Sequence, residues 1–263
     1  MCLSSFSISI LHDYNTVSGK TWRARKIPAQ LPGMTLMTSV RFKTKIRTEY
    51  GPFAQWLGRT VLKLGGWKLV GRNPGVPRCV VACAPHTSNW DFIWTLAAAM
   101  ALSLPCVFMI KHTVFRGPIG WLLAWLGGVP VNRSAPGGIV EQMARVMRQH
   151  ERINVVITPE GTRKQVEYWK LGFYRIAWAA DVPVLFGIMS YRERWIGVSE
   201  LLYLTGDLET DWEKIQESFQ RTVGLTPKYR EKEAEAFRRE KDALRQRVLG
   251  SIANDAREIS SAP

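Results

Sequence analysis

The stretch Arg78-Cys-Val-Val-Ala-Cys-Ala-Pro-His86 predicts the centre of the fold. Its first seven residues form a short, apolar and partly β-branched run, which is typical of a strand that is buried on both faces of a sheet. This strand leads directly into a polar segment that begins at His86. Catalytic groups concentrate on loops that a rigid sheet holds in place, so we expect a functional site at the end of this strand.

The segment that follows contains no charged residue over the 19 positions from Phe92 to Ile110. On length alone, this segment would qualify as a transmembrane helix. Pro105 argues against a single span, because proline removes a helical hydrogen bond and disfavours helical backbone at the residue before it. We therefore predict a buried helix to about Leu102 and then a strand over Cys106–Ile110.

Further downstream, short apolar runs alternate with helical patterns. The segments are an apolar, Trp-rich stretch at Gly117–Leu126, a strand around Val129–Val131, a helix at Glu141–Gln149, and strands at Asn154–Thr158 and Val182–Ile188. Such alternation predicts an α/β fold with a mixed, mainly parallel central sheet flanked by helices. Binding sites in these folds gather at the ends of the strands.

The composition changes twice along the chain, which predicts three parts. Residues 1–48 contain eight Lys and Arg against one Asp and lack periodicity, so we expect a basic, disordered arm; an organelle transit peptide is the alternative. Residues 49–210 form the predicted α/β domain. It opens with a basic amphipathic helix at Phe53–Leu64, which either docks on the core or contacts a membrane. Residues 211–263 are predicted to be a charged helical tail that packs on the domain or extends from it.

The formal net charge of +14 requires an anionic partner, either nucleic acid or an anionic bilayer. The basic residues are spread out, with no helix-turn-helix, zinc or RNA-binding signature, so we expect no nucleic acid. Eleven Trp suit a bilayer interface, and we expect a peripheral or monotopic protein on the cytoplasmic face of a membrane. The four cysteines show no CxxC pattern, which favours free thiols in a reducing compartment and no zinc.

Two polar clusters directly follow predicted strands: His86-Thr-Ser-Asn-Trp-Asp91 and Glu160-Gly161-Thr162-Arg163. If the chain turns into a helix after His86, the Asp91 carboxylate can fix the imidazole tautomer and stabilise the imidazolium, as a histidine general base requires. A structural histidine is the alternative for this pair taken by itself. The guanidinium of Arg163 suits bidentate phosphate recognition. Further positive charge could come from three residues whose alternative is ordinary surface charge: Lys111, Arg133 and Lys170.

Taken together and in order, these clusters resemble the sequence blocks of the glycerolipid acyltransferase family of phospholipid synthesis. The His-x4-Asp block corresponds to His86–Asp91, and the unaltered Glu-Gly-Thr-Arg block to Glu160–Arg163. Gly128–Arg133 resembles the block that ends in Arg, and Val182-Pro183-Val-Leu the final apolar block with proline. Lys170-Leu-Gly172 is similar to the family's Lys-x-Gly, and the resemblance spans about Gly71 to Gly187.

The resemblance implies direct acyl transfer without a covalent acyl-enzyme, a cofactor or a metal. His86 would take a proton from an acceptor hydroxyl as that oxygen attacks the thioester of acyl-CoA or acyl-carrier protein, and Asp91 would orient His86. Arg133 and Arg163 would hold the acceptor's phosphate, with Glu160, Gly161 and Thr162 shaping the loop. The apolar segments at Phe92–Leu102 and Gly117–Leu126 are candidates for an acyl-binding groove.

The acceptor is less narrowly predicted than the reaction. Pro85 stands where many members of the family have Asn, and the sequence after Arg163 differs from enzymes that make phosphatidic acid. We expect 1-acylglycerol-3-phosphate first, then another lysophospholipid or the hydroxyl of an amino- or glycolipid. A non-catalytic membrane-binding protein is the alternative of another class, and the complete set of four polar residues His86, Asp91, Glu160 and Arg163 argues against it.

Overall fold

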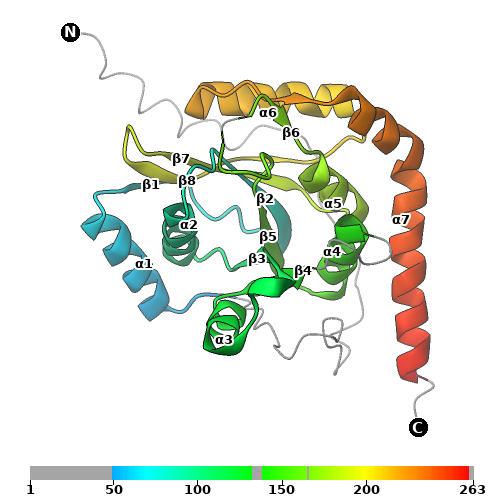
Figure 1. Ribbon diagram of the computed structural model, residues 1–263, viewed down its shortest axis with the longest axis horizontal. Helices are drawn as coiled ribbons and strands as arrows, with labels where there is room; N and C mark the ends of the chain where they lie inside the picture. Colours follow the sequence, from blue (N-terminus) through cyan, green and yellow to red (C-terminus); the bar gives the residue numbers. More distant parts are fainter. Residues whose placement is uncertain (1–48, 132–137, 165, 261–263) are drawn as a thin grey trace.

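The computed structural model describes residues 49–131, 138–164 and 166–260, with side chains to residue 254. Its centre is a seven-stranded sheet in the order β1-β8-β7-β2-β5-β3-β4 (Figure 1). Neighbouring strands pair in parallel except β7 and β8, which are antiparallel. The strands are β1 (Lys68–Val70), β2 (Arg78–Ala84), β3 (Cys106–Lys111), β4 (Gly128–Val131), β5 (Ile153–Ile157), β7 (Val184–Ser190) and β8 (Trp195–Leu202). The prediction of a mixed, mainly parallel sheet is confirmed.

Helices cover both faces of this sheet. They are α1 (Pro52–Leu64), α2 (Trp90–Ala101), α3 (Gly117–Trp125), α4 (Gly138–Gln149), α5 (Gly172–Ala180), α6 (Leu208–Val223) and α7 (Glu231–Ser260), with a short 3₁₀ helix at His112–Val114. On one face α2 packs against the sheet and α1 lies outside it. On the other face lie α4, α5 and α6, and α7 runs along the outside of α4 and α5 (Figure 1). A small second sheet pairs β6 (Tyr168–Trp169) with β9 (Lys228–Tyr229).

The long uncharged segment divides where the sequence predicted. The helix α2 ends at Ala101, and β3 begins at Cys106. Between them Ser103 has a φ of 50°, and the backbone N–H of Leu104 donates back to the Ala99 carbonyl. Within the described ranges, no helix is both long enough and apolar enough to cross a bilayer.

The charged C-terminal segment forms two helices that pack on the domain. Trp212 and Phe219 of α6 and Phe237 of α7 are buried in the same core cluster as the strands β2 and β5. This packing explains how a helix as polar as α7 is held, because its apolar side chains lie along the face that meets α4 and α5. The predicted basic arm, residues 1–48, lies outside the described residues.

The helix α1 takes the first of the two roles that its sequence left open, because it docks on the core. Gly58 and Leu62 are buried against α2, and a Cβ at Gly58 would lie only 2.5 Å from the Ala97 carbonyl oxygen, so only glycine permits this close approach. The opposite face of α1 is exposed and largely apolar. One face of α1 therefore docks on the core, and the opposite, largely apolar face is exposed.

Candidate active site

Three adjacent parallel strands at the middle of the sheet end at one place. β2 lies between β5 and β7, and each strand is followed at its carboxyl end by polar residues. His86 follows β2, the loop from Thr158 to Arg163 follows β5, and Tyr191 follows β7. Because parallel strands share one carboxyl edge, this topology brings the two predicted clusters together and adds a residue that the sequence analysis did not identify.

The His86 imidazole and the Asp91 carboxylate form a hydrogen-bonded pair. Nδ1 of His86 lies 2.9 Å from Oδ2 of Asp91. The turn into α2 produces this contact, since Asp91 occupies the first turn of the helix that begins at Trp90. The His86 side chain is 26% exposed and that of Asp91 only 4%, so the carboxylate is shielded while the imidazole can be reached from outside.

Four donors surround the Asp91 carboxylate. Besides His86, the backbone N–H groups of Thr87 and Ser88 donate to Oδ2, at 2.6 and 2.9 Å. The Tyr191 hydroxyl donates to Oδ1 at 2.6 Å. Burial raises the pKa of the Asp91 carboxyl, but the four hydrogen bonds outweigh it and leave this pKa below its ordinary value. Asp91 is therefore held as an anion in a fixed orientation beside His86.

Tyr191 is the residue of this site that sequence reasoning missed. Its ring packs edge-on against Trp67, with 5.0 Å between ring centroids, so the hydroxyl is aimed at Asp91 by apolar packing. Burial and the neighbouring carboxylate raise the pKa of Tyr191 to about 12, and the hydroxyl stays a donor near neutral pH. The one available signal was position: Tyr191 follows a predicted strand, as His86 and Glu160 do.

Glu160 points inward and holds the backbone of the first cluster. Its carboxylate accepts a hydrogen bond of 2.7 Å from the backbone N–H of His86, and its side chain is buried. Burial raises the pKa of the Glu160 carboxyl, while the hydrogen bond from His86 opposes the shift. In this arrangement Glu160 fixes the position of His86.

The remainder of the second cluster faces outward. Nη1 of Arg163 donates to Oδ1 of Asn89 at 2.7 Å, which ties the exposed guanidinium to the loop of His86. Gly161 adopts a φ of 63°, and its α-carbon lies under the Lys170 side chain, with the Lys170 ammonium 3.0 Å from where a Cβ would stand. The backbone N–H of Lys170 also donates to Pro159. Arg163 of this loop and Lys170, which contacts the loop, thus both supply positive charge on the side of His86.

Three further predicted residues have different outcomes. The hydroxyl of Thr162 accepts from the backbone N–H of Lys164 and shapes the loop. Lys111 is exposed at the end of β3, on the same carboxyl edge but beyond β5. Arg133 lies outside the described residues; β4 ends at Val131 on that same edge.

Two spaces adjoin the His86–Asp91 pair. An open hollow of about 480 Å³ is lined by Thr87, Ser88, Trp90, Trp94 and Tyr191. Its walls combine the loop that holds Asp91 with two Trp side chains of α2.

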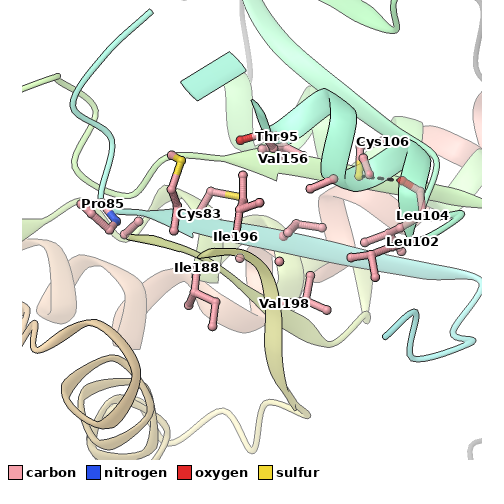
Figure 2. A pocket seen from close by; sticks show the side chains of 17 residues that line it. Cys83, Pro85, Thr95, Leu102, Leu104, Cys106, Val156, Ile188, Ile196 and Val198 are labelled. Carbon is pink, nitrogen blue, oxygen red and sulfur yellow. Dashed lines mark hydrogen bonds between the residues drawn. The ribbon is translucent and has the colours of Figure 1, made fainter. Parts of the chain in front are cut away.

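A partly enclosed apolar cavity of about 40 Å³ lies between the sheet and α2 (Figure 2). It extends from Cys83 and Pro85, next to His86, towards Leu102 and Leu104 at the far end of α2. The predicted segment Phe92–Leu102 therefore contributes to an apolar space beside the site. The described residues that line this cavity include none from Gly117–Leu126, the other predicted segment.

Comparison with known protein families finds a likeness over the part of the domain that carries the site. Residues 73–188 match the model of a family described as Acyltransferase. This match covers the strands β2 to β5, most of β7 and both polar clusters, so the part of the chain that carries the site is similar to the acyltransferase family.

One solved structure with a similar fold is the crystal structure of the 1-acyl-sn-glycerophosphate (LPA) acyltransferase PlsC from Thermotoga maritima. The likeness has a TM-score of 0.47 and 16% sequence identity, and it covers 64% of this chain and 76% of that chain. No curated protein has a sequence that matches this chain significantly.

Proposed function

We propose that this chain transfers a fatty acyl group from an acyl-CoA or acyl-carrier-protein thioester to a hydroxyl of a lysophospholipid, with 1-acylglycerol-3-phosphate as the first candidate. The observation that carries the proposal is the pair of His86 and Asp91, with a reachable imidazole and a buried, fourfold hydrogen-bonded carboxylate. This is the arrangement that a histidine general base needs.

In the proposed reaction, the acceptor oxygen attacks the carbonyl carbon of the thioester while His86 removes the hydroxyl proton. A C–O bond forms and the C–S bond breaks. The thiolate leaves with the proton that the imidazolium returns, so the histidine ends the cycle neutral. Asp91 stabilises the imidazolium between these two steps.

The state of the thiols near the site supports direct transfer. Cys83 lines the apolar cavity, and burial raises the pKa of its thiol to about 12. Burial also raises the pKa of Cys79 and Cys106. A protonated thiol is a poor nucleophile, so the thiols of these three cysteines are unsuited to carry the acyl group.

The acyl chain of the donor is proposed to enter the apolar cavity from the side of Pro85. This end of the cavity lies next to the proposed base, so a thioester carbonyl at His86 would direct its chain inward. A cavity of about 40 Å³ admits only a few methylene groups, and a long chain therefore requires α2 to move away from the sheet.

Recognition of a phosphorylated acceptor is assigned to Arg163. We expect Arg163→Ala to raise the KM for 1-acylglycerol-3-phosphate by about 10- to 100-fold, because a charge-assisted hydrogen bond contributes roughly 1.5 to 3 kcal/mol. The value of kcat should change much less. Lys164→Ala is the matched control, since it removes the neighbouring exposed cation. Steady-state kinetics that show equal effects of both substitutions would contradict a specific role for Arg163.

Tyr191 is proposed as a positioning residue. Tyr191→Phe keeps the ring that packs on Trp67 and removes only the donor to Asp91. We expect kcat to fall about tenfold, equivalent to roughly 1.4 kcal/mol, with little change in KM.

The control for this substitution is Tyr203→Phe, which alters an exposed tyrosine that follows β8. β8 runs antiparallel to β7, so this residue lies at the other edge of the sheet. A Tyr191→Phe protein with wild-type kcat, or one whose KM rises as much as its kcat falls, would remove Tyr191 from the mechanism.

The proposed function is tested by offering the purified protein a panel of acceptors with acyl-CoA or acyl-carrier protein as donor. The panel contains 1-acylglycerol-3-phosphate, other lysophospholipids, and amino- and glycolipids with a free hydroxyl. Mass spectrometry of the lipids formed should show one preferred acceptor that gains an acyl group. Absence of an acylated product from every combination would refute the proposed function.

A further inference from the structure

The helices α1, α2 and α3 bury small residues and leave several large apolar residues exposed. In α3, Gly120 and Ala124 are buried, whereas Ile119 and Trp121 are 63% and 65% exposed. The reverse arrangement is expected of a helix that packs on the core of a protein and faces water on its other side.

The other two helices also leave large apolar side chains exposed. α1 buries Gly58 and Leu62 but leaves Phe53 and Leu64 exposed, and α2 buries a run of alanines at 97–99 while Trp90 is exposed. Within the described part of the chain, all large apolar side chains that are more than half exposed lie on these three helices. We call this set the apolar surface: Phe53, Trp56, Leu64, Trp90, Ile119 and Trp121.

The charges on the same part of the chain have one sign. From Tyr50 to Val140 the sequence contains eight Lys and Arg but a single acidic residue, Asp91, which is buried in the site. Arg59 and Arg116 are exposed on or next to α1 and α3. The helices α6 and α7, which are rich in Glu, lie away from α1 and α3, along the top and right of Figure 1. The molecule thus separates an apolar, basic side from a side with mixed charge.

We propose that the apolar surface docks on an anionic lipid bilayer, with α3 as an inserted element alongside α1. Trp side chains sit at headgroup depth, and nearby Lys and Arg are attracted to anionic lipids. A second copy of this chain is a poorer occupant, because two surfaces with the same positive charge repel each other. This inference rests on the proposed function, in which the acceptor is a lipid. Trp90 belongs to the apolar surface and also lines the hollow beside Asp91, so docking would turn this hollow towards the membrane.

The test is sedimentation of the full-length protein with vesicles of phosphatidylcholine containing phosphatidylglycerol. The double variant Ile119→Glu/Trp121→Glu should lower partitioning by about tenfold or more, because two carboxylates replace apolar side chains at an anionic interface. The matched control, Tyr203→Glu/Leu249→Glu, alters two exposed apolar residues outside the apolar surface and should bind like the wild type. Phe53→Glu/Trp56→Glu provides a second, independent variant on α1, should the first fail to fold.

The controls separate docking from catalysis. Vesicle binding is measured without substrate, and acyl transfer to a short-chain, water-soluble lysolipid should be the same for the α3 variant and the wild type. An inactive wild type that still binds vesicles through α3 would refute the proposed function and leave the docking surface intact. Unchanged vesicle binding by both surface variants would overturn the docking surface. The docking surface would also be overturned if the variants only converted a dimer into a monomer in analytical ultracentrifugation.

Discussion

Replacement of His86 with alanine is expected to lower the rate of acyl transfer by about 10²- to 10⁴-fold, the usual contribution of a positioned general base. The structure gives the reason: His86 is the reachable member of a hydrogen-bonded pair whose other member is buried. The measurement is the initial rate of thiol release from acyl-CoA in the presence of 1-acylglycerol-3-phosphate. Donor binding should change little, because the substitution removes only the imidazole.

The matched control for His86→Ala is His150→Ala. His150 follows α4 and precedes β5, at the edge of the sheet opposite to the site, and its Nδ1 lies 2.8 Å from the Val146 carbonyl oxygen. This control should retain wild-type activity. Substantial activity in the His86→Ala protein, with thermal stability like that of the wild type, would show that another group removes the proton.

Substitution of Asp91 with asparagine should have the second-largest effect, a fall in kcat on the order of 10²-fold or more, because the amide cannot stabilise an imidazolium as an anion does. The fold should survive, since the amide oxygen can still accept from the backbone N–H groups of Thr87 and Ser88. Asp91→Ala should lose similar activity and also about 1 kcal/mol of stability, because the backbone N–H groups of Thr87 and Ser88 both lose their acceptor. Thermal unfolding with steady-state kinetics separates these two outcomes.

The Asp91→Asn variant should also change how stability depends on pH. The pKa of Asp91 lies below its ordinary value in the folded protein, so the carboxylate stabilises the fold at neutral pH, and this contribution is lost as the pH falls through the folded pKa. The difference in melting temperature between wild type and Asp91→Asn should therefore shrink below about pH 4, near the ordinary pKa of aspartate. A difference that is constant from pH 7 to pH 3 would contradict the anionic state of Asp91.

Much of the fold followed from local sequence patterns. The break at Pro105 and the buried strands β2 and β5 were predicted because apolar runs and proline act over a few residues. β1 and β8 were not predicted: β1 has only three residues, and Ser199 and Glu200 interrupt the apolar pattern of β8. Their identity as strands depends on pairing between distant segments, which a local pattern does not contain.

In the site, too, contacts between residues close in sequence were predicted and contacts between distant residues were not. The pair of His86 and Asp91 lies within six residues, and the sequence was sufficient to propose their contact. The hydrogen bonds from His86 to Glu160 and from Tyr191 to Asp91 join residues 74 and 100 positions apart. They became visible only when the order of β5, β2 and β7 in the sheet was known.

The most direct test of the account is the balance between thiol and lipid product in one reaction. Purified wild-type protein receives isotopically labelled acyl-CoA or acyl-carrier protein, first alone and then with the preferred lysolipid. We predict that thiol appears only after the acceptor is added, in equal amount to the labelled acyl chain found on the lipid hydroxyl, with no label on the protein. Thiol release without an acceptor, or label retained on the protein, would contradict direct transfer by His86.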